Sequence, residues 1–306
     1  MRKLWKLLVY LAAGLAVIGF VVFSFVLFPA HWQIRSLAID IPPAEAVDAA
    51  LEAIDEENLP TEIFFVNTAQ QSSPFGHLGH VGILISWRNG NTFLIDTGMS
   101  PAEAVAFGKP FEYLGAGPTA AYGSIEAQLG TAVEDIRGIG FTHLHTDHTA
   151  GIARLCSKMS SPAPIYQTPD QQQLHNLHTQ DSQTLVNTSK CAKEMLGYDT
   201  IKAVPGFPGL FAIAAGGHTP GSTIYVTRVN TETWIFAGDI TNAMADIQDN
   251  RGKGFAYSYL LIPEDTDLLE RWRLWLKAQD DRDGVQVLVA HDIDAYQASE
   301  LTQWRQ

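Results

Sequence analysis

The first thirty residues restrict the architecture of this chain more than any other segment. They contain a run without a single charge from Leu7 to Phe28, which is 22 residues. A helix rises about 1.5 Å per residue, so this run would extend about 33 Å, close to the hydrocarbon thickness of a bilayer. The run therefore predicts one transmembrane helix, with residues 1–30 as the membrane anchor.

A cleaved signal peptide is the alternative interpretation of the same segment. Signal peptides have a shorter apolar core of about 7–15 residues and end at a small-x-small cleavage site. This run is longer, and Phe28-Pro29-Ala30 is a poor cleavage site, so we predict an uncleaved anchor.

The charges that flank the run predict its orientation. Arg2, Lys3 and Lys6 precede it, whereas Arg35 is the only basic residue soon after it. The positive-inside rule then places the N-terminus in the cytoplasm and residues 31–306 on the periplasmic or extracellular side.

The rest of the chain predicts a linker with a helix over residues 31–60, followed by one large domain over residues 61–306. Strand-like and helical patterns alternate in that domain, which is typical of a layered α/β fold. Residues 98–123 are rich in glycine, proline and aromatic residues and predict a long irregular loop beside a pocket. The net charge of −13 argues against a nucleic-acid partner, which usually needs a basic face.

The two cysteines, Cys156 and Cys191, are not in a paired metal-ligand spacing. A disulfide would form in an oxidising compartment. Two separate core thiols are the alternative, and the sequence leaves the choice open.

Three of the ten histidines fall within the stretch THLHTDH, residues 142–148. His143, His145 and His148 stand there with Asp147. Buried imidazoles need hydrogen-bond partners, and these residue types bind divalent metals. In extended backbone His143 and His145 project to one face. Two histidines cannot complete a zinc site, so further ligands must come from elsewhere in the chain.

Four more polar residues each follow an apolar run that predicts a strand. They are Asp96, His218, Asp239 and His291. Side chains at strand ends converge on one edge of a sheet, where sites of α/β proteins commonly lie. Together with THLHTDH they offer enough ligands for two metal ions.

The motifs HLHTDH, GHTPGS, AGD and AHD, in this order, resemble the motif series of the metallo-β-lactamase superfamily. The resemblance covers residues 61–295. It implies a four-layer αβ/βα sandwich with the site at one edge of two facing sheets, here preceded by one transmembrane helix.

The resemblance also implies roles for individual residues. His143, His145 and His218 would bind a first metal ion, and Asp147, His148 and His291 a second. Asp239 would bridge both ions, and Asp147 and Asp239 are the expected catalytic carboxylates. Asp96 would orient a ligand. We expect two divalent ions, zinc by preference, with a bridging hydroxide as the nucleophile.

The expected activity is hydrolysis of a small-molecule ester or lactone. Asp239 occupies a position where class-defining β-lactamases carry cysteine or serine, so a true β-lactamase is disfavoured. Thioester hydrolysis and phosphodiester cleavage stay open on the same fold. A phosphodiesterase would prefer basic residues near the pocket, and Arg251 with Lys253 form the only obvious basic cluster. A non-enzymatic, membrane-tethered binding protein is the alternative of another class.

Other histidines and tyrosines have weaker predicted roles. We expect His77 and His80 to line the pocket without binding metal. His175 and His178 are predicted on the solvated face of a polar helix. Three tyrosines could donate a proton to the leaving group, and the sequence does not rank them. They are Tyr225, Tyr257 and Tyr259.

Overall fold

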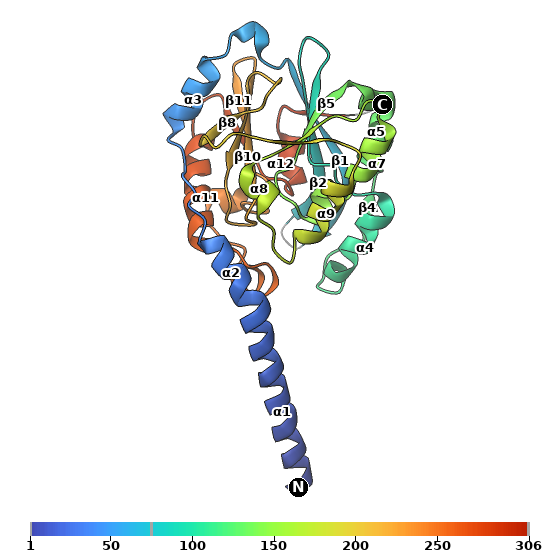
Figure 1. Cartoon of the computed structure of the whole chain (residues 1–306), viewed down its shortest axis with the longest axis vertical. Helices are drawn as coiled ribbons and strands as arrows, with labels where there is room; N and C mark the ends of the chain where they lie inside the picture. The colour runs from blue at the N-terminus through green and yellow to red at the C-terminus, as the bar shows by residue number, and fades with distance from the viewer. Residues whose placement is uncertain (1, 74–75, 305–306) are drawn as a thin grey trace.

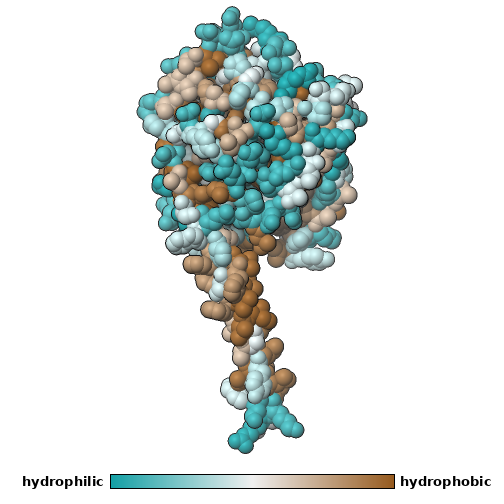
Figure 2. All heavy atoms as spheres, viewed as in Figure 1, coloured by the Kyte–Doolittle hydropathy of each residue, from teal (hydrophilic) through white to brown (hydrophobic). Residues whose placement is uncertain are grey.

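The computed structural model describes residues 2–73 and 76–304. A single rod of helix forms its N-terminal part and projects from the domain (Figure 1). The rod consists of α1 (Arg2–Val22), the π-helical turn η1 (Phe23–Leu27) and α2 (Phe28–Arg35). By length and composition it can cross a membrane, and none of its most apolar part is buried. Figure 2 shows apolar side chains along this stem up to its junction with the domain.

The first sheet consists of strands between residues 62 and 195, joined by one strand, β13, from near the C-terminal end of the chain. Their order is β13-β1-β2-β3-β5-β6-β7, and β4 pairs with β1 outside this path. The strands are β1 (Glu62–Ser73), β2 (Gly76–Ser86), β3 (Thr92–Ile95), β4 (Thr119–Ala121), β5 (Ile136–Gly140), β6 (Ile165–Gln167), β7 (Lys193–Met195) and β13 (Thr302–Gln303). The run from β3 through β5 and β6 to β7 is parallel, so these strands end at the same edge of the sheet.

The second sheet has the order β12-β11-β10-β9-β8. Its strands are β8 (Ile201–Ala203), β9 (Leu210–Ala214), β10 (Thr223–Val229), β11 (Glu232–Phe236) and β12 (Val285–Leu288). β11 and β12 are parallel, whereas β8, β9, β10 and β11 alternate in direction.

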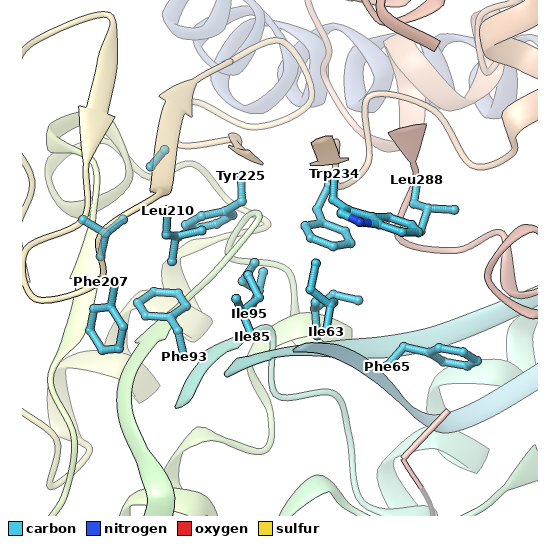
Figure 3. Packing of buried hydrophobic residues seen from close by; sticks show 14 of the residues in the cluster. Ile63, Phe65, Ile85, Phe93, Ile95, Phe207, Leu210, Tyr225, Trp234 and Leu288 are labelled. Atoms are coloured by element: carbon cyan, nitrogen blue, oxygen red, sulfur yellow. The ribbon is translucent and has the colours of Figure 1, made fainter. Parts of the chain in front are cut away.

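The two sheets pack face to face over a core of large apolar side chains. Figure 3 shows Phe93 and Ile95 of the first sheet opposite Tyr225 and Trp234 of the second. Phe93 lies 4.9 Å from Phe207 between ring centroids, in an edge-to-face arrangement that favours the contact. This interface between the two sheets forms the centre of the domain.

Helices cover the outer face of each sheet. On the second sheet lie α3 (Ala44–Glu52) and α11 (Thr266–Asp280), which bury side chains such as Leu51 and Trp272. On the first sheet lie α5 (Ile125–Leu129) and α7 (Ile152–Lys158). The result is the predicted four-layer αβ/βα sandwich, so the predicted fold class is confirmed.

Short helices complete the loops around the sheets. They are α4 (Pro101–Glu112), η2 (Glu56–Asn58), η3 (Gly130–Asp135), α6 (Thr146–Thr149), α8 (Pro169–Gln173), α9 (Gln180–Thr188), α10 (Met244–Gln248), the π-helical turn η4 (Ala256–Leu261) and α12 (Ile293–Ala298).

Two local expectations were wrong. Residues 98–123 are not one irregular loop, because α4 occupies twelve of them and begins at a capping box formed by Ser100 and Glu103. His175 and His178 do not lie on a helix, since α8 ends at Gln173 and α9 begins at Gln180.

Cys156 and Cys191 form a disulfide in the structure, with their Cα atoms 5.5 Å apart. The bond joins α7 to the segment that leads into β7 and closes a stretch with a sequence separation of 35. Of the two interpretations left open by the sequence, the structure has the disulfide.

Candidate metal centre

The seven predicted ligands come from four places in the chain that the fold brings to one edge of the sandwich. β5 ends at Gly140, and the loop after it carries His143 and His145. The single turn α6 then holds Asp147 and His148. The turns after β9, β11 and β12 supply the remaining three, His218, Asp239 and His291. All of these side chains are buried apart from His145, which is half-buried.

Three groups of side chains in the described residues have the spacing of a metal site. His143, His145 and His218 form one group, whose ligand atoms all lie within 4.8 Å of one another. A second group contains His148 and Asp239 together with His143. The three histidines that we predict to bind the first metal ion therefore lie close enough for one ion to contact all of them.

Asp239 lies between the two sides of the cluster. Its Oδ2 is 3.6 Å from His218 Nε2 on one side and 3.1 Å from His291 Nε2 on the other. Its Oδ1 is 3.6 Å from His148 Nε2. This placement between the two sets of ligands fits a carboxylate that contacts two ions.

The backbone before Asp239 needs a glycine. Gly238 has φ +57, a conformation that side chains with a Cβ rarely adopt. A Cβ there would also lie 2.8 Å from Thr142 Cβ, so the AGD turn and the THLHTDH loop approach each other closely because this residue is glycine.

Several polar atoms of the cluster are buried without a hydrogen-bond partner among the described residues. They are His80 Nδ1, His143 Nε2, His145 Nε2, His148 Nε2 and Asp239 Oδ1. Buried polar atoms without partners cost free energy, so such a concentration is rare unless another group satisfies them. Imidazole nitrogens and carboxylate oxygens that converge in this way fit divalent cations such as zinc.

The electrostatics of the cluster agree with that assignment. Burial holds the pKa of His143 and of His145 well below the usual value, and neighbouring histidines add to the effect. These side chains are therefore neutral at pH 7, which is the form that binds a metal. Burial would raise the pKa of Asp239, but the facing histidines, His291 first, outweigh it and keep the carboxylate charged.

Asp96 contacts a predicted ligand and not the centre of the cluster. Its Oδ2 is 2.9 Å from His148 Nδ1, and its two oxygens accept hydrogen bonds from the backbone and hydroxyl of Thr142. Asp96 has φ 60, an unusual value for a residue other than glycine. The strained turn thus aims a carboxylate that fixes the orientation of His148, as the sequence led us to expect for Asp96.

Glu264 has a similar position behind His218, and the sequence gave no signal for it. Its Oε1 lies 2.6 Å from His218 Nδ1, and Ser258 donates a hydrogen bond to its Oε2 at 2.6 Å. Burial would raise the pKa of Glu264, but the Lys253 ammonium and His218 lower it to about 2. Glu264 is therefore a charged group that orients His218, a predicted ligand, from outside the cluster.

Lys253 is not part of an accessible basic patch. It is buried, its Nζ lies 3.2 Å from Glu264 Oε1, and it donates a hydrogen bond to the backbone oxygen of Asp239. Arg251 is exposed and pairs with Asp246. The two residues that could have formed a phosphate-binding cluster are therefore already paired with acidic groups.

His80 lies closer to the cluster than expected, whereas His77 does not. His80 Nδ1 is 3.4 Å from Asp147 Oδ2, and His80, Asp147 and His291 form the third group with metal-site spacing. His77 is half exposed and pairs with Asp294. An exposed, paired histidine of that kind has no contact with the predicted ligands.

A cavity of about 290 Å³ opens onto the cluster. Phe107 and Phe111 of α4 form one wall, and Tyr257 and Leu261 of η4 form another. His178 also lines the cavity, while His175 is exposed outside it. The polar cluster therefore lies at the end of a pocket with largely apolar walls.

The structure ranks the three tyrosines. Tyr225 is fully buried in the core between the sheets, and Tyr259 faces α2. Only Tyr257 of the three lines the pocket. Burial raises the pKa of Tyr257, so its phenol keeps its proton at neutral pH.

Comparison with known proteins identifies the arrangement. The family model of the Metallo-beta-lactamase superfamily matches residues 77–291. No protein with a curated description matches the chain.

Solved structures share the fold at low sequence identity. One is an N-acyl homoserine lactone hydrolase with the product N-hexanoyl-L-homoserine at its catalytic metal centre, with 15% identity and a TM-score of 0.58 over 79% of this chain and 98% of that one. A probable metal-dependent hydrolase from Staphylococcus aureus has 16% identity and a TM-score of 0.52 over 76% and 90%. AidC, a dizinc quorum-quenching lactonase, has 16% identity and a TM-score of 0.52 over 76% and 88%.

Proposed function

The chain belongs to the metallo-β-lactamase superfamily and is a metal-dependent hydrolase, and on that premise we propose that it opens lactones or cleaves related esters with two bound divalent ions. The observation that carries this proposal is the convergence of six other predicted ligand side chains around Asp239, at the end of an apolar pocket. In this proposal residues 1–30 are the anchor, residues 31–60 the linker and helix, and residues 61–306 the hydrolase domain.

The proposed ligand sets are those that the sequence motifs imply. His143, His145 and His218 hold the first ion, Asp147, His148 and His291 hold the second, and Asp239 contacts both. We expect zinc, because imidazole and carboxylate ligands suit it. When bound, the ions would lower the pKa of a water molecule and polarise the substrate carbonyl.

The residues of the chain itself contribute orientation, exclusion of water and a proton. Asp96 and Glu264 fix the rings of His148 and His218 by hydrogen bonds to the nitrogens that face away from the cluster. Phe107, Phe111 and Leu261 form pocket walls that exclude water from the acyl group. Tyr257 is the protonated group at the pocket that could donate to the leaving oxygen.

A neutral acyl substrate is supported by the charges around the pocket. A phosphodiesterase would prefer an unpaired cation beside the cluster, but Lys253 is paired with Glu264 and Arg251 with Asp246. The lactonases that share this fold act on N-acyl lactones, and an acyl chain would suit walls of phenylalanine and leucine. Lactones are therefore our first candidate and thioesters our second.

The proposed location is a single-pass membrane protein with its N-terminus in the cytoplasm and its hydrolase domain on the periplasmic or extracellular side. The basic residues before the helix support this orientation. The disulfide between Cys156 and Cys191 supports it independently, because disulfides persist in oxidising compartments.

The test is a substrate screen of the full-length chain in detergent micelles. Proton release on lactones, thiol release on thioesters and nitrophenol release from bis-nitrophenyl phosphate would be measured on one preparation. We expect the largest kcat/KM for a lactone. A larger kcat/KM for the phosphodiester would contradict the proposal, and metal-free protein without any turnover would favour the binding-protein alternative.

A further inference from the structure

The mouth of the catalytic pocket lies at the end of the domain from which the N-terminal helix leaves. In Figure 1, the orange segment that contains η4 lies beside α2, and α4 lies at the same end of the domain, on the side away from the stem. Both elements line the pocket, α4 through Phe107 and Phe111 and η4 through Tyr257 and Leu261. The pocket walls and the helical stem therefore share one end of the molecule.

Contacts between α2 and the domain fix this relation. His31 Nε2 lies 3.1 Å from the backbone oxygen of Tyr259, and the Arg35 guanidinium lies 5.3 Å from the centre of the Tyr259 ring. Gln33 donates a hydrogen bond to the backbone oxygen of His175. The helix thus contacts two segments that border the pocket, η4 and the loop between α8 and α9.

η4 separates two cavities. Tyr259 contributes to a cavity of about 490 Å³ whose other walls are helix residues, among them Phe28 and Trp32. Tyr257 and Leu261 contribute to the catalytic pocket. A single helical turn therefore lies between the stem and the catalytic pocket.

Each of the three segments around the mouth also exposes large apolar side chains. At the end of α4, Tyr113 is 82% exposed and Leu114 is 81% exposed. At η4, Phe255 is 68% and Leu260 59% exposed, and Leu177 in the loop between α8 and α9 is 63% exposed. We call these five residues the apolar rim. The three segments border one pocket, and large apolar side chains that are exposed together at such a place indicate an interaction surface.

The position of the rim along the stem favours a bilayer as its partner. The uncharged run of the helix ends at Phe28, and contact with η4 begins at His31, less than one turn further along. If the run spans the hydrocarbon core, η4 lies in the headgroup region. Aromatic and leucine side chains are the residues that enter this region from interfacial surfaces.

We propose that the apolar rim lies in the headgroup region of the membrane that anchors the chain, and that substrates with long acyl chains enter the catalytic pocket from the bilayer. The substrate class rests on the proposed function, whereas the position of the rim does not. Phe107, Phe111 and Leu261 would continue the apolar path from the rim to the cluster.

The position of the rim is tested first, without any use of activity. Both native cysteines are disulfide-bonded, so Leu114→Cys and Leu260→Cys each provide a unique site for a fluorescent label on the full-length chain. The chain would be placed in phosphatidylcholine vesicles that contain lipids with a spin-label quencher. Asn89→Cys is the control. Asn89 lies in the turn that joins β2 to β3, at the end of these two strands opposite to Asp96 and the cluster.

We expect quenching at positions 114 and 260 to exceed quenching at position 89 by about threefold or more, as for side chains in the interface. Equal quenching at all three positions would overturn the proposal. Protection of positions 114 and 260 from both the lipid quencher and a water-soluble quencher would also overturn it, because a second copy or another protein would then cover the rim.

The substrate route is tested by placing negative charges on the apolar rim. Leu114→Glu combined with Leu260→Glu should reduce hydrolysis of a long-chain lactone dissolved in vesicles by about tenfold, with hydrolysis of a short-chain soluble lactone within about twofold. Met195→Glu combined with Leu274→Glu adds the same charge at exposed apolar positions elsewhere and should change neither rate. An equal loss on both lactones would overturn the route. If the wild type hydrolyses no lactone, the proposed function fails, and the quenching result still decides the position of the rim.

Discussion

The N-terminal helix and the histidine cluster depart from the usual distribution of side chains in opposite ways. The helix exposes large apolar residues such as Leu15 and Phe20, whereas the cluster buries charged and polar residues such as Asp147 and Asp239. Either arrangement would be unfavourable for an isolated chain in water. We therefore propose a partner of specific chemistry for each, which is lipid for the helix and divalent cations for the cluster.

The two regions also differ in how the chain produces these unusual distributions of side chains. Every apolar residue of the helix lies in one continuous segment, so local sequence alone determines its character. The cluster takes its residues from four separate turns, which only the completed sandwich brings together. We therefore expect changes in the helix to leave the domain folded, and changes in the cluster to weaken metal binding.

The largest predicted effect tests the lipid partner. Leu11→Arg combined with Leu15→Arg would place two charges inside the uncharged run, and a charge costs up to about 3 kcal/mol for membrane insertion as it approaches the helix centre. We expect the variant to disappear from alkali-extracted membranes. Leu11→Ile with Leu15→Ile is the control and should stay with the membrane. Unchanged recovery of the arginine variant would show that the helix does not span the bilayer.

The next effect tests the cation partner. Asp239→Asn keeps the shape of the side chain but removes the charge between the two ligand sets. We expect lower metal content and a loss of at least about 10²-fold in turnover, equivalent to about 2.7 kcal/mol. His175→Ala, at an exposed position outside the pocket, should stay within a few-fold of wild type. Metal content and turnover like those of wild type in Asp239→Asn would exclude the proposed role.

A smaller effect separates orientation of a ligand from simple burial of charge. Glu264→Gln removes the charged acceptor behind His218, and we expect about tenfold weaker metal binding in competition with a chelator. Glu103→Gln is the control, because Glu103 pairs with Arg154 at a more exposed position away from the cluster. Thermal unfolding of the metal-free proteins would report any cost of leaving Lys253 without its partner. Equal metal affinities of the two variants would contradict a positioning role for Glu264.

Much of the fold and the cluster could be predicted because their signals are local. An apolar strand that ends in a histidine or aspartate recurs at Asp96, His218, Asp239 and His291, and strand ends share an edge in a layered fold. The start of α4 was missed, although Ser100 and Glu103 have the spacing of a capping box. Gly108 and Pro110 concealed that helix, because both residues are unfavourable in helix interiors.

Other features depend on contacts between distant segments. Glu264 is 46 residues from His218 and follows no strand, so its role is visible only after the chain has folded. Lys253 looked like a free cation in the sequence and is a buried partner of Glu264 in the structure. His80 lies in the middle of β2, and its approach to Asp147 depends on how that strand packs against α6.

The most direct test of the account is the metal content of the purified full-length chain. Elemental mass spectrometry on protein prepared without added chelator should find two divalent ions per chain, and zinc is the expected element. Dialysis against a strong chelator should remove both ions and the hydrolytic activity, and added zinc should restore both. A chain that hydrolyses its substrate with no bound divalent ion, or with unchanged activity after their removal, would contradict the central claim.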